Sequence, residues 1–165
     1  MSAQSVNEKL VHQVQNAHAM ERSVLRMLES LISTTDDAEI KEMLEHHHEE
    51  TKRHEQLLAG RLEAMGEGTS TPRELAAVGG ALVKGLADQV RPGKQGKNAR
   101  DAYVTEHLEI ATYELLERLA KLAGDQETAA VAKQNCADER QMAKRIDKNW
   151  DKFLELSLQD IAVPA

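Results

Sequence analysis

The amino-acid sequence predicts an all-α protein organised around four long helices. Three observations indicate this: the composition, apolar positions that recur in steps of three and four residues, and breaks rich in glycine, proline and short polar side chains. The hydrophobic share is 41%, yet only 2% of the 165 residues are aromatic. Ala, Leu, Val and Met supply most of it, a mixture that favours helices over strands. The length fits a single domain, residues 1–165.

The net charge and the lack of long apolar segments argue against two classes of binding partner, nucleic acids and membranes. A formal net charge of -7 argues against nonspecific nucleic-acid binding, which calls for a basic face. The first ten residues lack the apolar core of a signal peptide, and no stretch reaches the roughly 20 apolar residues that span a bilayer. We therefore expect a cytoplasmic protein without nucleic-acid or membrane partners.

The first predicted hairpin covers about residues 5–65. Its first stripe recurs in helical steps and consists of Leu10, Val14, Ala17, Glu21, Val24, Leu28 and Leu31. Thr34-Thr35-Asp36-Asp37 then offers side chains that cap a helix. The second stripe consists of Ile40, Met43, Leu44, His47, Glu50, His54, Leu58, Leu62 and Met65. Because the turn between them is short, the two helices are expected to be antiparallel neighbours.

A long crossover is predicted for about residues 66–98, which hold seven of the nine glycines. Thr71-Pro72 precedes a short helix expected from about Arg73 to Asp88, since Pro is favoured at a first helical position. The basic stretch from Arg91 to Lys97 is interpreted as a solvated loop. The crossover therefore separates two helical hairpins.

The second predicted hairpin covers about residues 99–157. Its first stripe consists of Ala99, Ala102, Glu106, Glu109, Ile110, Tyr113, Leu116 and Ala120. Gly124 is a natural helix stop and Asp125 can cap the next helix. The last stripe consists of Ala129, Ala132, Cys136, Glu139, Met142, Ala143, Ile146, Trp150 and Phe153. Two hairpins joined by one long crossover are the connectivity of ferritin-like four-helix bundles.

Each of the four stripes is interrupted near its middle by glutamate: Glu21, Glu50, Glu106 or Glu109, and Glu139. A buried carboxylate is costly unless it is paired or metal-bound, and a shared cation would explain all four. The midpoint of Glu21 and Glu50 falls in the first turn, and that of Glu109 and Glu139 is Gly124. Both pairs lie about 15 residues, or about 22 Å of helix, from their turns. The alternative is that these carboxylates reach solvent at stripe edges and pair with Arg or Lys.

The histidines gather around Glu50. His54 lies four residues after it and His47 three before it, so all three project from one helix face. His54 is a candidate ligand or a polar core residue, and the same alternatives stay open for His47 and His18. His46 and His48 flank the stripe, where we expect them to face solvent or lie at its margin.

The donor types favour one or two iron or manganese ions, and zinc remains open. Di-iron carboxylate bundles use Glu from two helices and Glu-x-x-His from the other two. This spacing is absent at the stripe glutamates: Arg53 stands three residues after Glu50, and Met142 three after Glu139. Tyr113 would either be a core residue with a satisfied hydroxyl or hydrogen-bond a ligand. Cys136, the single cysteine, is expected to be a reduced core residue.

Four segments carry a family resemblance: Ala17–Glu21, His47–Lys52, Glu106–Tyr113 and Asp138–Ala143. In this order they resemble the YciE/YciF-type branch of the ferritin-like superfamily, over roughly residues 5–155. The resemblance implies a rubrerythrin-like bundle, a homodimer, bacterial origin and an association with stress responses. By position it implies metal ligands at Glu21, Glu50, Glu109 and Glu139, with Glu106 needed for a full dinuclear site. His54 stands where many relatives have Gln, and Ala143 where some carry an acid.

Two functions compete at this point. The first is a metalloprotein that binds one or two iron or manganese ions in the bundle core and reacts with dioxygen or peroxide in oxidative stress, as a di-metal oxidase or with peroxidase-like activity. The second is a non-catalytic stress or interaction module on the same fold. The apolar stretch Leu75–Val83 adds support for a homodimer, because it exceeds what one helix face needs to cover.

Overall fold

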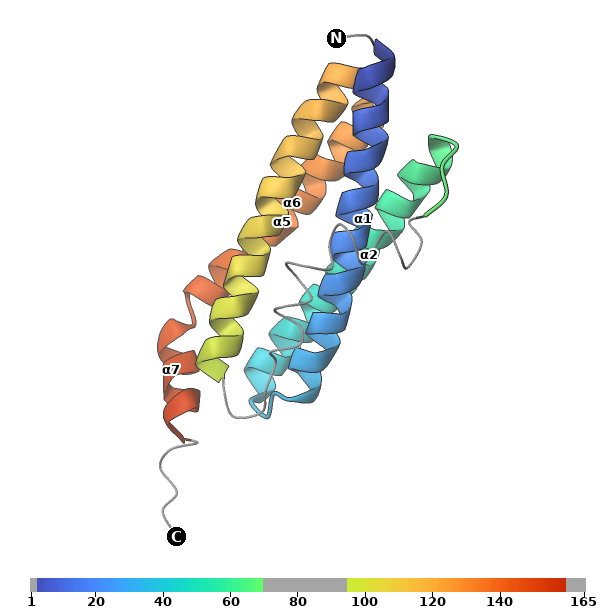
Figure 1. Ribbon diagram of the computed structural model, residues 1–165. Coiled ribbons are helices and arrows are strands. Elements are labelled where there is room, and N and C mark those ends of the chain that lie inside the picture. Colours follow the sequence, from blue (N-terminus) through green and yellow to red (C-terminus); the bar gives the residue numbers. More distant parts are fainter. Residues whose placement is uncertain (1–2, 70–94, 160–165) are drawn as a thin grey trace.

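A computed structural model describes residues 3–69 and 95–159 of the chain. They form five helices: α1 (Ala3–Ser33), α2 (Ala38–Ala64), α5 (Gln95–Ala123), α6 (Gln126–Asp147) and α7 (Trp150–Gln159). Figure 1 shows α1 and α2 as one antiparallel hairpin and α5 and α6 as the other, with α1 against α5 and α2 against α6. This confirms the all-α, ferritin-like four-helix bundle. The short helix expected over residues 73–88 and the stretch 75–83 lie outside the described residues.

The predicted stripes face the inside of the bundle. Every apolar residue of the first stripe is buried, and Leu58, Leu62 and Leu116 are 0% exposed. Burial of one such leucine contributes about 1.5–3 kcal/mol relative to exposure, so these positions supply much of the force that joins the hairpins. No helix among the described residues is long and apolar enough to cross a membrane.

The turns carry the caps that the sequence predicted. Asp37 Oδ1 accepts a hydrogen bond from the Ile40 amide at 3.0 Å, and Asp125 Oδ1 accepts from the Thr128 amide at 2.9 Å. Gly124 ends α5 with φ of 81°, in the left-handed region that glycine adopts without a steric penalty. Arg61 of α2 donates to Asp125 Oδ2 at 3.1 Å, so the start of α6 is tied to the other hairpin.

The third helix begins earlier than the sequence indicated. The loop interpretation extended to Lys97, but α5 already starts at Gln95. The amide of Gly96 donates to Ser157 Oγ of α7 at 2.7 Å, and a Cβ at this glycine would lie 2.8 Å from that oxygen. A tertiary contact with α7 therefore offsets the weak helix propensity of glycine.

The fourth stripe also spans a helix break that the periodicity did not reveal. α6 ends at Asp147, and α7 begins at Trp150. Asn149 occupies the junction: its side chain donates to the Arg145 carbonyl at 2.8 Å, and its own carbonyl accepts from the Phe153 amide at 3.0 Å. Phe153 remains buried as predicted, at 4% exposure, because α7 packs beside the start of α5 (Figure 1).

Candidate metal centre

Helix α2 places two histidines in the middle of the bundle. Its buried face consists of Ile40, Leu44, His47, Thr51, His54, Leu58 and Leu62. His47 and His54 are seven residues apart, about two turns, so both project from this face, and both are 0% exposed. The small Thr51 between them donates its hydroxyl to the His47 carbonyl at 2.9 Å. It leaves room for the two imidazoles.

The first group of possible ligands brings His47 together with three glutamates from α5 and α6. One atom each of His47, Glu106, Glu109 and Glu139 lies within 4.8 Å of the others, and all four residues are buried. His47 Nε2 is 3.4 Å from Glu106 Oε1 and 3.4 Å from Glu139 Oε2. These distances leave space for a cation between the donors.

A second group lies beside the first and shares one residue with it. Glu21, His54 and Glu139 also offer one atom each within 4.8 Å. His54 Nδ1 lies 2.8 Å from Glu139 Oε1 and 3.8 Å from Glu21 Oε1. Because Glu139 belongs to both groups, its two oxygens face two adjacent positions.

Most of the donor atoms have no hydrogen-bond partner within the described ranges. They are Glu21 Oε2, His47 Nε2, His54 Nδ1 and both carboxylate oxygens of Glu106, Glu109 and Glu139. An unpaired buried polar atom is costly, and an unpaired buried charge more so. A bound divalent cation would satisfy these atoms together, so the residues present fit a metal. The oxygen-rich donor set with two imidazoles suits iron, manganese or zinc.

The carboxyl groups are strongly perturbed without a cation. Burial, reinforced by the charge of Glu139, raises the pKa of Glu21 to about 8. Burial also raises the pKa of Glu109 well above its usual range, with added repulsion from Glu139 and Glu21. For Glu139, burial again raises the pKa well above the ordinary value, although His47 opposes the shift. At neutral pH the metal-free site therefore holds protons that a metal would displace.

Glu50 lies outside both groups and orients His47 instead. Its side chain is 16% exposed at the edge of α2, and Oε2 accepts from His47 Nδ1 at 3.3 Å. This bond leaves Nε2 facing Glu106 and Glu139. Burial acts to lower the pKa of His47, but Glu106, Glu50 and Glu139 together raise it well above the usual range. Burial acts to raise the pKa of Glu50, and contact with His47 lowers it overall.

Asp138 orients His54 in a matching way. Its Oδ2 lies 3.1 Å from His54 Nε2 and accepts from Arg53 at 2.5 Å, while Oδ1 accepts from Gln134 at 3.0 Å. A carboxylate that already accepts from Arg53 requires His54 Nε2 to be the protonated nitrogen. The lone pair of Nδ1 then faces Glu139 and Glu21, as metal-ligating histidines are usually held.

Tyr113 reaches the site from α5. Its hydroxyl donates a short hydrogen bond to Glu21 Oε1 and accepts one from Asn135 Nδ2 at 3.0 Å. The ring meets His54 edge-on, with centroids 6.2 Å apart. Burial and the charge of Glu21 raise the pKa of Tyr113 well above its usual range. Tyr113 is therefore a core residue with a satisfied hydroxyl, and the same hydroxyl also contacts a possible metal ligand. Both interpretations from the sequence apply to it.

The remaining histidines lie away from the two groups. His18 Nε2 bonds Glu55 Oε1 at 2.9 Å and belongs to neither group. His46 is 56% exposed and His48 22% exposed, as expected for residues beside the stripe. Cys136 is a buried free cysteine, also as expected.

Sequence reasoning missed Asp138 and Asn135, which are buried on α6. Asn135 directly precedes Cys136, and Asp138 directly precedes Glu139. Their positions next to predicted core residues could have indicated that they are buried too. Polar residues next to a buried carboxylate are natural hydrogen-bonding partners.

Solved structures with the same fold come from several bacteria. A protein from Xanthomonas campestris pv. campestris is 26% identical, covers 96% of this chain and 99% of its own, and superposes with a TM-score of 0.79. The Escherichia coli stress protein YciF is 18% identical, with coverage of 91% and 97% and a TM-score of 0.76. A bacterioferritin-related protein from Bacteroides fragilis, described as a dodecameric thioferritin, is 16% identical, with coverage of 96% and 98% and a TM-score of 0.80. At 16% and 18% identity the likeness shows the fold alone.

The sequence itself gives the family. A family model matches residues 5–159, which include the four helices of the bundle except the first two residues of α1, and both groups of possible ligands. Together with the fold shared with YciF, this match confirms the resemblance to the YciE/YciF-type branch that the helical motifs indicated. The chain therefore belongs to the family described as a domain of unknown function, DUF892.

Proposed function

We propose that this protein binds two adjacent iron or manganese ions inside the four-helix bundle and supports oxidative-stress chemistry with dioxygen or peroxide. The observation that carries the proposal is the pair of buried ligand groups that share Glu139. His47, Glu106 and Glu109 would complete one position, and Glu21 and His54 the other. Glu139 would bridge them.

The surrounding residues have distinct tasks in this proposal. Glu50 and Asp138 hold the two imidazoles so that each turns a lone pair toward the carboxylates. Tyr113 holds Glu21 through its hydroxyl. A bound iron or manganese pair would supply the change of oxidation state, and the buried carboxylates would balance its charge.

A metal titration of chelator-treated protein tests the proposal. We expect two equivalents of manganese or ferrous iron per chain. Glu139→Gln replaces the shared carboxylate with a neutral amide that offers only one oxygen and should abolish both, whereas Glu21→Gln should spare the position at His47. Glu49→Gln is the matched control, because Glu49 lies on the same helix as His47 but is 70% exposed. Binding that survives Glu139→Gln unchanged would contradict the site.

The same titration separates the two candidate functions. Oxidation of the bound metal on addition of peroxide supports the redox function. Protein that binds no metal, or binds it without any oxidation by dioxygen or peroxide, would favour the non-catalytic stress module.

We also infer that two copies of the chain pair through the outer face of α5. Along that face an apolar series follows steps of four and three residues, at Val104, Leu108, Ala111, Leu115 and Leu122, interrupted by Arg118. Leu115 and Leu122 are 63% and 66% exposed. Apolar residues at this spacing are typical of the face along which one helix packs against another.

Sedimentation analysis tests the homodimer. The unaltered chain should sediment as a dimer at micromolar concentration, and Leu115→Lys should shift it to the monomer because a charge would enter an apolar seam. Leu158→Lys changes a similarly exposed leucine on α7 and should leave the dimer intact. If the unaltered chain sediments as a monomer, the inferred homodimer is wrong.

A further inference from the structure

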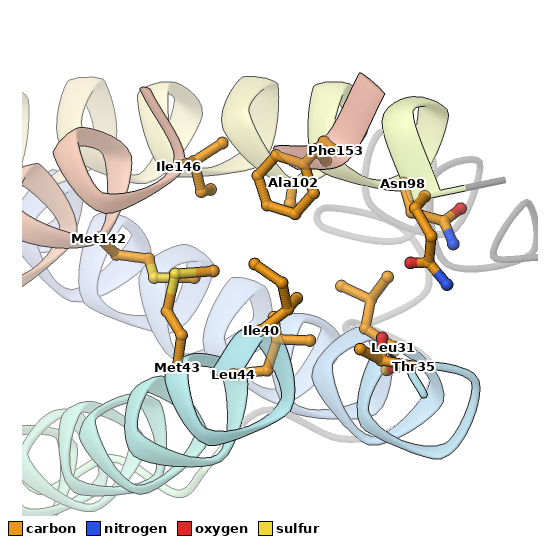
Figure 2. A pocket seen from close by; sticks show the side chains of 12 residues that line it. Leu31, Thr35, Ile40, Met43, Leu44, Asn98, Ala102, Met142, Ile146 and Phe153 are labelled. Atoms are coloured by element: carbon orange, nitrogen blue, oxygen red, sulfur yellow. Dashed lines mark hydrogen bonds between the residues drawn. The ribbon is translucent and has the colours of Figure 1, made fainter. Parts of the chain in front are cut away.

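A largely apolar cavity, partly open to the surface, lies between the helices of the bundle beside the carboxylate cluster. Its volume is about 20 Å³, counted as space open to the centre of a water-sized molecule. Figure 2 shows Met43 and Met142 at one end of this cavity, and Thr35 and Asn98 at the other. Ile40, Leu44, Ala102, Ile146 and Phe153 are among the side chains that line it between those ends.

Three helices contribute both to the cavity wall and to the cluster. Met43 lies four residues before His47 on α2, and Ala102 lies four before Glu106 on α5. Met142 lies three residues after Glu139 on α6. One helical turn rises about 5.4 Å, so the methionine end of the cavity lies about one turn from the ligand groups.

The size and lining of the cavity determine which small molecules can bind in it. A site needs roughly 10–15 Å³ on this measure to hold one water-sized molecule, so about 20 Å³ admits a diatomic molecule and no organic substrate. Apolar cavities stay dry and take up apolar guests, whereas water requires two to four polar partners. The wall near the cluster offers thioether, methyl and aliphatic groups. At this end water and peroxide lack polar partners, so dioxygen is the suitable guest, whereas Thr35, Gln95 and Asn98 place polar groups only at the other end.

We propose that this cavity binds dioxygen and holds it one helical turn from the carboxylate cluster. Its relation to metal chemistry rests on the proposed function, while the binding itself depends only on the cavity. Small side chains are essential to it: Ala102 faces the space with a single methyl group, and any larger residue there would fill it.

The binding is testable on the metal-free chain, because dioxygen is paramagnetic and relaxes nearby nuclei. The protein is labelled at its methionine methyl groups, treated with chelator and placed under oxygen pressure. Met142 and Met27 are both 1% exposed, but only Met142 lines the cavity. We expect a several-fold larger relaxation enhancement at Met142 than at Met27. Equal enhancement at the two methyl groups would overturn the proposal.

A filled cavity provides the second comparison. Ala102→Leu should remove the excess enhancement at Met142 while metal stoichiometry in a separate titration stays unchanged, and Ala130→Leu, on the exposed side of α6, should alter neither. An excess that persists in a folded Ala102→Leu chain would overturn the proposal. If Ala102→Leu does not fold, the comparison of Met142 with Met27 decides alone. Absence of metal binding with the excess at Met142 intact would refute the proposed function but support the gas site.

Discussion

The two imidazoles of the site are held by carboxylates that lie outside the ligand groups. Glu50 accepts from the Nδ1 of His47, and Asp138 contacts the Nε2 of His54, so opposite nitrogens face the centre. The difference follows from position, because His47 and His54 sit two turns apart on α2 and approach the cluster from different ends. Glu50 belongs to neither ligand group and contacts His47, so its role as a ligand, which the stripe suggested, stays a prediction.

Loss of either imidazole should weaken metal binding more than loss of a neighbouring surface histidine. We expect His54→Ala to reduce manganese affinity by more than the roughly 10- to 100-fold typical of a change in a residue that only orients a ligand. His48→Ala is the control, since its ring is on the margin of the same helix. Competition with a metal indicator measures both. Equal losses would mean that the histidine cluster chelates metal at the surface.

Because the folded chain holds a proton on Glu21, the metal-free protein should become less stable as the pH rises. Its pKa is about 8 in the folded chain against an ordinary value of 4.5. The folded chain therefore holds a proton that the unfolded chain has released, so the free energy of unfolding falls between these values. The raised pKa values of Glu109, Glu139 and His47 act in the same direction.

Urea denaturation from about pH 5 to about pH 8, with chelator present, measures this slope. Glu21→Gln should make the slope shallower, because the amide stays neutral at every pH while keeping an oxygen for Tyr113. The exposed Glu49→Gln should leave it unchanged. A slope in Glu21→Gln as steep as in the unaltered chain would show that Glu21 is not the group that titrates.

At the scale of the helices, periodicity predicted most of what the structure contains. The stripes identified the buried faces of α1, α5 and α6, including Glu21, Glu106, Glu109 and Glu139. On α2 the periodicity placed Glu50 on the buried face, whereas the structure buries the next residue, Thr51. Steps of three and four residues allow either position between His47 and His54. Only packing decides that choice: the inner position is crowded by two imidazoles, and the smaller threonine occupies it. The break at Asn149 was also hidden, since Phe153 continues the stripe across it.

Two exposed glycines should respond to alanine in opposite directions. Gly124 has φ of 81°, where a Cβ costs roughly 1–2 kcal/mol, so Gly124→Ala should destabilise the protein by about that amount. Gly60 lies inside α2, and the space that an alanine methyl group would occupy there is open. Gly60→Ala should therefore stabilise by about 0.5–1 kcal/mol. Chemical denaturation measures both, and destabilisation by Gly60→Ala would contradict the helical environment described.

At the scale of the whole molecule, the site joins the two hairpins. Glu21 and His54 come from α1 and α2, whereas Glu106, Glu109 and Glu139 come from α5 and α6. Without a cation, like charges or shared protons meet at this junction and weaken it. With a cation, the same carboxylates become a connection between hairpins that the chain otherwise links through residues 65–94.

Metal should therefore raise the thermal stability of the whole bundle. A ligand present at 100 times its dissociation constant adds about 2.7 kcal/mol, which corresponds to roughly 5–11 °C for a chain of this size. Glu139→Gln should melt close to the unaltered chain when metal-free, because burial raises the pKa of that carboxyl group well above its ordinary value and a neutral amide suits the same buried position. It should lose the metal-induced increase. Leu62→Ala is the control: it opens the core and should cost about 2–5 kcal/mol in both states while keeping the increase. Calorimetry with and without manganese measures all three chains, and an unchanged increase in Glu139→Gln would mean that metal stabilises the protein from somewhere other than the junction of the hairpins.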